Sequence, residues 1–305
     1  MITSVFNKSK PINFIIVLAF VLVLFSISNF ELFFGNLNTL FSTLTRVLVV
    51  VFLVFLLDFI VSKNNLTQRN SYAILVFGVA LGVFPEIINN INLLLANVFI
   101  LFALRRILSL SSNKQVKKKL FDASFWIALA TLLYFWAILF FAIIIVALIY
   151  YSQNDLRNVL IPLVGVATVA MLLLGYNIIF HDAYIRPSNF ERFSSLDYTS
   201  YNSLENIFKL TILFTAFIWT IIYFFRSLTD KNNKLKPSYF IVAWTSIIGI
   251  LIAIISPYKD GSEFVFFIAP FAIIMANYIE AISEKWFKEV FVGIFILTPI
   301  IGLIL

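Results

Sequence analysis

The sequence predicts an all-α integral membrane protein that crosses the bilayer about 11 times (10–11). Hydrophobic residues make up 62% of the 305 residues and charged residues only 12%, whereas soluble globular proteins average about 45–50% and about 25%. Mean hydropathy is +1.01. Apolar stretches of roughly 17–25 residues, the length that spans a bilayer as a helix, follow one another along the chain. We therefore expect residues 1–305 to form a single transmembrane domain.

Composition also excludes several kinds of chemistry. The chain has no Cys and one His, which excludes disulfides, thiolate metal sites and Cys nucleophiles and argues against a metal centre. Phosphate-loop, dinucleotide, HExxH and GxSxG motifs are absent, so ATP-driven transport and hydrolysis have no support. No cofactor or metal is expected, since the motifs and ligands for them are missing. No nucleic-acid partner is expected either, because Lys and Arg in membrane proteins primarily determine topology.

The first four spans follow from the apolar pattern. Ile12–Ser28 comes after Lys8 and Lys10 and is interpreted as an uncleaved span, because it is long for a signal peptide and more spans follow it. The expected spans after it are Leu40–Ser62, Tyr72–Phe84, which Pro85 ends, and Asn92–Leu108, which leads into a basic run.

The stretch Phe121–Tyr151 allows two interpretations. Its 31 residues contain no Gly or Pro and would measure about 46 Å as one helix, against a hydrocarbon core of about 30 Å. It forms either one steep helix or two short helices that turn near Tyr134. The two-helix hairpin keeps the later basic clusters on the same side as Lys114–Lys119, and we expect that arrangement.

The remaining expected spans are Val159–Phe180, Ile207–Phe225, Tyr239–Ile255, Phe264–Ile282 and Val290–Leu305. With this order, all but five of the 22 Lys and Arg residues lie on one side; the five are Arg46, Arg186, Arg192, Lys209 and Lys259. The positive-inside rule then predicts a cytoplasmic N-terminus and a C-terminus on the outer side, which is the periplasmic side if the membrane is a bacterial inner membrane.

Two polar segments are expected on the outer side. Residues 181–206 form a loop rich in Tyr, Ser and Asn, much longer than a simple connection needs, and such loops are either functional or disordered. Ser256–Phe264 carries Lys259, Asp260 and Glu263 on a turn bracketed by Pro257 and Gly261. It is either a polar connection between two spans or part of a site.

Most of the acidic and basic side chains that could bind or react with a ligand are therefore expected on the outer face. Carboxylates together with Arg and Lys suit a phosphorylated lipid, because the cations hold phosphate and a carboxylate accepts a proton from a hydroxyl. Outer loops of any multi-pass protein also contain acids and bases. Arg46 lies within the second span, where an Arg is functional by default, although it could also reach the interface or pair with Glu31.

Two stretches resemble a known family. Residues 92–151, from "NLLLANVFILFALRRILSLSS" to "KLFDASFWIALATLLYFWAILFFAIIIVALIYY", and the later "SPYKDGSEFVFFIAPFAIIMANYI" resemble polytopic glycosyltransferases of the C-type fold (GT-C). The resemblance implies a GT-C-like helical bundle, with Lys259 holding the phosphate of a polyprenyl carrier. Glu31 matches the position of the family's carboxylate, but in a loop of about eleven residues instead of a long one. The whole chain also resembles uncharacterised bacterial membrane proteins of similar length.

The resulting hypothesis is an inner-membrane, glycosyltransferase-like protein that acts on a lipid-phosphate-linked sugar at the outer face. Glu31 would be the catalytic base, and Arg46, Arg186, Arg192, Lys259, Asp260 and Glu263 would bind substrate and phosphate. The expected partners are the lipid bilayer and a polyprenyl-phosphate carrier. Three alternatives stay open: a degenerate, non-catalytic relative, a non-enzymatic component of an envelope-assembly complex, and a transporter for a lipid-linked glycan.

Overall fold

The computed structural model describes residues 2–30, 37–151, 155–182, 184, 194–229, 232–257 and 259–305. These residues form helices and connections, with no β-strand among them. The helices are α1 (Ile2–Phe6), α2 (Pro11–Ser28), α3 (Leu37–Lys63), α4 (Tyr72–Val83), α5 (Glu86–Asn89), α6 (Ile91–Leu108), η2 (Ser109–Ser112), α7 (Val116–Leu133), η3 (Phe135–Phe140), α8 (Phe141–Tyr150), α9 (Leu156–His181), η5 (Thr199–Tyr201), α10 (Leu204–Ser227), α11 (Lys236–Ile255), η6 (Ser262–Phe264), α12 (Val265–Ala281) and α13 (Lys285–Gly302).

The predicted all-helical fold is confirmed for the described residues, since the expected apolar stretches are helical over most of their length. Within the described ranges, seven helical segments are long and apolar enough to cross a membrane: α2, α3, α6 with η2, α9, α10, α11, and η6 with α12. The apolar helices Tyr72–Val83 and Phe135–Tyr150 are shorter. The count of about 11 crossings stays a prediction.

The stretch 121–151 is a hairpin, as expected. Helix α7 ends at Leu133, Tyr134 takes an extended backbone conformation, and η3 and α8 follow. The chain then returns to its starting end, because the Tyr151 hydroxyl donates to the carbonyl of Leu108 at the end of α6 (3.2 Å). The non-helical turn is buried and Tyr134 stacks on Phe266 of α12 at 5.5 Å, which suits irregular backbone at membrane depth.

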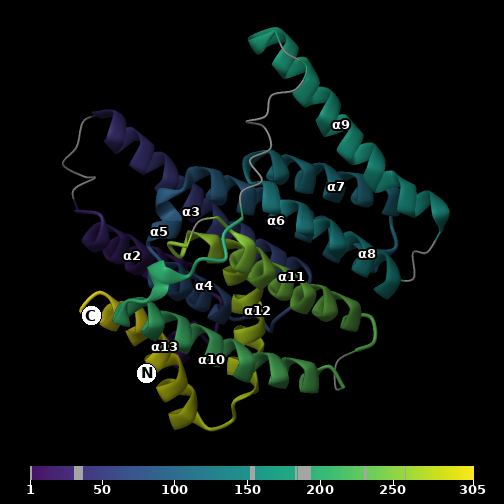
Figure 1. Cartoon of the computed structure of the whole chain (residues 1–305). Coiled ribbons are helices and arrows are strands. Elements are labelled where there is room, and N and C mark those ends of the chain that lie inside the picture. The colour runs from purple at the N-terminus through teal and green to yellow at the C-terminus, as the bar shows by residue number, and fades with distance from the viewer. Residues whose placement is uncertain are drawn as a thin grey trace.

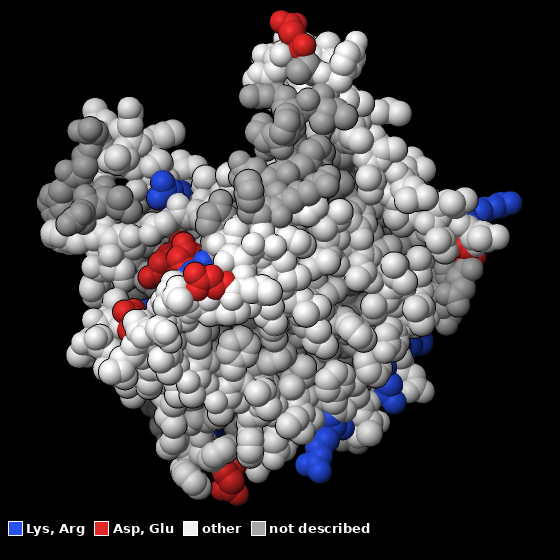
Figure 2. All heavy atoms as spheres, viewed as in Figure 1, with Lys and Arg blue, Asp and Glu red and all other residues white. Residues whose placement is uncertain are grey.

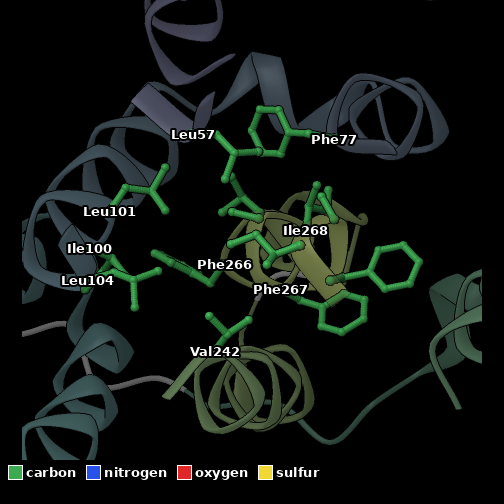
Figure 3. Packing of buried hydrophobic residues seen from close by; sticks show 14 of the residues in the cluster. Leu57, Phe77, Ile100, Leu101, Leu104, Val242, Phe266, Phe267 and Ile268 are labelled. Carbon is green, nitrogen blue, oxygen red and sulfur yellow. The ribbon is translucent and has the colours of Figure 1, made fainter. Parts of the chain in front are cut away.

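Helix α12 is the centre of the bundle. In Figure 3 its residues Phe266, Phe267 and Ile268 lie at the middle, surrounded by side chains of α3, α4, α6 and α11. All residues of α12 from Val265 to Ile279 are buried, and so is every residue of α4. The backbones of α11 and α12 come close at Gly249, where an added Cβ would lie 2.8 Å from the Cα of Phe267.

One end of the bundle carries most of the basic residues, and we call it the basic end. Lys63 ends α3, Arg226 lies in the last turn of α10, and Lys236 and Lys285 begin α11 and α13. Hydrogen bonds tie this end together: the Tyr239 hydroxyl of α11 donates to the carbonyl of Leu66 (3.0 Å), and Asn277 Nδ2 of α12 donates to the same carbonyl (2.9 Å). The opposite end, where α11 ends and α12 begins, is called the polar end.

Two helices project from the bundle in Figure 1, namely the N-terminal half of α3 and the C-terminal half of α9. Helix α9 has 26 residues, about 39 Å. Its described residues are mostly exposed, and only Asn158, Gly165, Val169 and Asn177 are buried. An apolar helix with so few buried residues is expected to face lipid or another chain over most of its surface.

Candidate substrate site at the polar end

The turn before α12 is fixed by local geometry. Gly261 has φ +93°, a backbone conformation that favours glycine, and an added Cβ would lie 2.5 Å from the ring of Phe84. Asp260 Oδ1 accepts hydrogen bonds from the Ser262 backbone N–H (3.0 Å) and hydroxyl (2.6 Å). The charged stretch therefore forms a tight turn, as its Pro and Gly predict.

Glu263 lies beneath this turn and is fully buried. Its Oε1 accepts a hydrogen bond from the Tyr201 hydroxyl, and its Oε2 accepts one from the Gly261 backbone N–H (3.0 Å). The same N–H lies 3.2 Å from the Tyr201 oxygen. Burial and the neighbouring Glu263 carboxyl raise the pKa of Tyr201 well above its ordinary value, so Tyr201 stays protonated and donates. The pair joins the polar loop to the start of α12.

Lys259 closes the C-terminal end of α11. Its Nζ donates to the carbonyls of Ala253 (2.8 Å) and Ile254 (2.7 Å) and lies 4.6 Å from the centre of the Tyr198 ring. A cation at a helix C-terminus is favourable, because unpaired carbonyls point toward it. Burial lowers the pKa of Lys259, while Glu263 acts in the opposite direction. Two of the three ammonium donors are thus used within the fold.

The second part of the polar loop folds over this turn. The Tyr198 hydroxyl donates to the Ile254 carbonyl (3.0 Å), and the Ser200 hydroxyl donates to the carbonyl of Lys259 (2.5 Å). Together with Tyr201, these residues hold the segment 194–203 against the ends of α11 and α12. For this half of the predicted loop, the structure is ordered by specific contacts.

An open polar cleft of about 370 Å³ lies between this segment and the turn. It is lined by Ser195, Asp197, Thr199, Ser200, Pro257, Lys259 and Asp260. A hydrogen bond from the Thr199 backbone N–H (3.0 Å) lowers the pKa of Asp197, so this carboxyl is ionised at neutral pH. Two carboxylates against one lysine make the cleft net negative. It therefore suits a ligand rich in hydroxyl groups better than a free phosphate.

A second ionic group lies next to the cleft. Lys209 is 2% exposed and pairs with Glu205, one turn earlier on α10. Glu86 of α5 lies near both, and its Oε2 is buried with no hydrogen-bond partner among the described residues. Burial raises the pKa of Glu86, which Lys209 partly opposes. Figure 2 shows acidic and basic atoms together in a patch over α5 and the start of α10, whereas basic atoms dominate the lower right edge.

The predicted site residues are distributed unevenly. Lys259 and Asp260 line the cleft, and Glu263 supports it from beneath. Arg46 is half-buried on α3 and makes no hydrogen bond or ion pair with any described residue. The predicted base Glu31, with Arg186 and Arg192, lies outside the described residues.

Sequence reasoning singled out neither Asp197 nor the roles of Tyr198 and Tyr201. The available signal was the concentration of tyrosines in the loop, which did not indicate the residues that these side chains contact. In the part of the chain that the structure describes, no three His, Asp or Glu residues are grouped closely enough to hold a metal ion.

Comparison with known proteins identifies a family for this chain. Neither the curated protein sequences nor the solved structures contain a significant match to this chain. A family described as "Family of unknown function (DUF6427)" matches residues 1–303, nearly the whole chain. The chain therefore belongs to this family of unknown function, DUF6427.

Proposed function

We propose that this protein is a glycosyltransferase-like membrane protein that binds a lipid-phosphate-linked sugar at its polar end. The observation that carries the proposal is the cleft of about 370 Å³, lined by hydroxyls, Asp197, Asp260 and Lys259. Carboxylates accept hydrogen bonds from sugar hydroxyls, and Ser and Thr hydroxyls both donate and accept. The cleft lies where helices that are apolar enough to cross the membrane end, so a sugar there can remain attached to a carrier within the bilayer.

In this proposal the sugar and the phosphate occupy different places. Asp197 and Asp260 favour sugar hydroxyls in the cleft and disfavour phosphate. The phosphate would be held by cations outside the cleft, for which Arg46, Arg186 and Arg192 are the candidates from the sequence. Glu31 stays the candidate base, and the bundle is proposed to be GT-C-like with about 11 crossings.

The binding test uses purified protein and polyprenyl-phosphate-linked sugars extracted from the host membrane, with the retained carrier measured by mass spectrometry. The wild type should retain the sugar-loaded carrier. Asp197→Asn keeps the hydrogen bond from Thr199 but loses the charge, and one charge-assisted hydrogen bond is worth about 1.5–3 kcal/mol. We expect retention to fall about tenfold or more. Asp182→Asn, at the exposed end of α9, is the matched control. Equal retention by wild type and Asp197→Asn would refute the assignment of the cleft.

We also propose the orientation, with the basic end in the cytoplasm of a bacterial inner membrane. Reporter fusions after Asn113 and Asn232 should report the cytoplasm, and fusions after Asn90 and Leu305 the periplasm. Asn113 follows η2 and Asn232 precedes α11, both at the basic end. The reverse result for all four fusions would invert the proposed topology and place the cleft in the cytoplasm.

A non-enzymatic component of an envelope-assembly complex is the second candidate. Helix α9 favours it, because this apolar helix has few buried residues and can present its exposed side to another chain. A scaffold should tolerate Asp197→Asn and lose function when exposed α9 residues such as Met171 are changed. The transporter reading has less support, because α12, the central helix, carries no charged residue between Glu263 and Glu280.

A further inference from the structure

An apolar groove lies between α10 and α13, with α12 as its floor. Its volume is about 260 Å³. The groove is lined by Ile212, Ala216 and Trp219 of α10, Met275 of α12, and Phe291 and Phe295 of α13. Apolar cavities of about 150 Å³ stay dry and accept apolar guests. A groove of this size and lining therefore takes a hydrocarbon ligand in preference to water.

The groove is closed toward the polar end. There Gly302 of α13 packs against the side chain of Lys209, and an added Cβ at Gly302 would lie 2.6 Å from Lys209 Cε. In Figure 1 the two helices are close near the C-terminus of α13 and diverge from there. A ligand can enter only from the side or from the basic end, so the groove is separate from the polar cleft and its ligand.

Aromatic side chains mark the opposite end of the groove. The rings of Tyr223 and Tyr278 lie 5.0 Å apart, and those of Tyr278 and Phe291 lie 5.1 Å apart, which connects α10, α12 and α13. Trp286 at the start of α13 is 66% exposed. Tyr and Trp with apolar bodies and polar tips are enriched at membrane interfaces, so this end of the groove lies near lipid headgroups.

The same end carries two exposed cations. Arg226 lies in the last turn of α10, on the face of Trp219, and Lys285 begins α13. Both are exposed, and neither forms an ion pair with any described residue. Glu284 precedes Lys285, while Lys234 and Lys236 add two cations near the start of α11. Basic residues between helices at this side of a membrane bind anionic headgroups.

We propose that the groove holds an acyl chain of an anionic glycerophospholipid from the leaflet at the basic end, with its phosphate near Arg226 and Lys285. Lipid tails are as apolar as the groove, so the chain is held by packing and shape. The headgroup determines which lipid is preferred. Each cation near the membrane surface raises the affinity for an anionic lipid about fivefold. This binding site is independent of the proposed sugar site.

The test reconstitutes the protein in nanodiscs with equal amounts of phosphatidylglycerol and phosphatidylcholine, then releases it into mild detergent for native mass spectrometry. The wild type should retain phosphatidylglycerol. Ala216→Trp fills the groove and should abolish retention, and the smaller Ala216→Leu should reduce it if the Trp variant does not fold. Ile218→Trp places the same ring on the 59% exposed side of α10 and should leave retention unchanged.

The headgroup is tested by charge. The double variant Arg226→Gln and Lys285→Gln should reduce the preference for phosphatidylglycerol over phosphatidylcholine about 25-fold, whereas Lys114→Gln, exposed at the same end between α6 and α7, should not. Equal retention of the two lipids by the wild type would overturn the proposal. So would retention by a folded Ala216→Leu variant equal to the wild type, or a protein dimer that Ala216→Leu disrupts.

Discussion

The hydrogen bond between Tyr201 and Glu263 connects the polar loop to the central helix, and removing it should destabilise the protein measurably. In Tyr201→Phe the ring stays, but a fully buried carboxylate oxygen of Glu263 loses its donor. A buried polar group left without a partner costs about 1–3 kcal/mol, and more when it is charged. For proteins of 150–250 residues, 1 kcal/mol lowers the melting temperature by about 2–4 °C. A longer chain shifts by no more than the lower end of that range per kcal/mol, so we expect a decrease of about 2–6 °C.

The assay is thermal unfolding of purified protein in detergent, with Tyr198→Phe as the matched control. Tyr198 also donates one hydrogen bond, to the Ile254 carbonyl, but it is 43% exposed, so water can replace its hydroxyl and the decrease should be much smaller. In a Glu263→Gln background, Tyr201→Phe should cost less than in the wild type, because paired residues are non-additive. Equal, additive decreases in both backgrounds would refute the view that this pair holds the loop.

Three further predictions follow from single contacts. Gly165→Leu should separate α9 from α7 and lower the melting temperature, because its Cβ would lie 2.1 Å from Ser124 Oγ, whereas Gly175→Leu, with no atom within 4 Å, should not; equal melting of the two would contradict this packing. Burial raises the pKa of Glu86 above 4.5, so its contribution to stability is lost as pH rises through the folded-state value, and Glu86→Gln should melt above the wild type at neutral pH with the difference vanishing near pH 4. Lys259→Ala should lower the melting temperature because two α11 carbonyls lose their donor, and Lys259→Arg should restore part of the loss. If Lys259→Ala melts at the same temperature as the wild type, Lys259 does not stabilise the end of α11.

Much of the fold follows from the sequence because the bilayer restricts the choices. A membrane requires each backbone polar group to be paired within the segment, so a long apolar run must be a helix. The thickness of the bilayer and the distribution of Lys and Arg also predicted the turn within Phe121–Tyr151. This stretch is too long for one crossing, and the structure has the turn at Tyr134. Pro257 and Gly261 likewise predicted the turn before α12, because their backbone preferences are local.

The polar end could not be predicted in the same way, because its contacts are between residues far apart in sequence. Tyr198 and Ile254 are separated by 56 positions, and Tyr201 and Glu263 by 62. No periodic pattern encodes such pairs, so the sequence indicated a polar loop and a charged turn but not that one covers the other. The burial of Glu263 was missed for the same reason, since a charged residue on a connection is usually exposed.

The most direct test of the central claim measures lipid-linked sugars in cells. A strain that lacks the gene should accumulate a polyprenyl-phosphate-linked sugar, and a plasmid copy of the wild type should restore its normal level. Asp197→Asn should restore it poorly while reaching the membrane in normal amount, and Asp182→Asn should restore it fully. If no lipid-linked sugar changes on deletion, or if Asp197→Asn restores the level as well as the wild type does, the proposed role of the polar cleft is wrong.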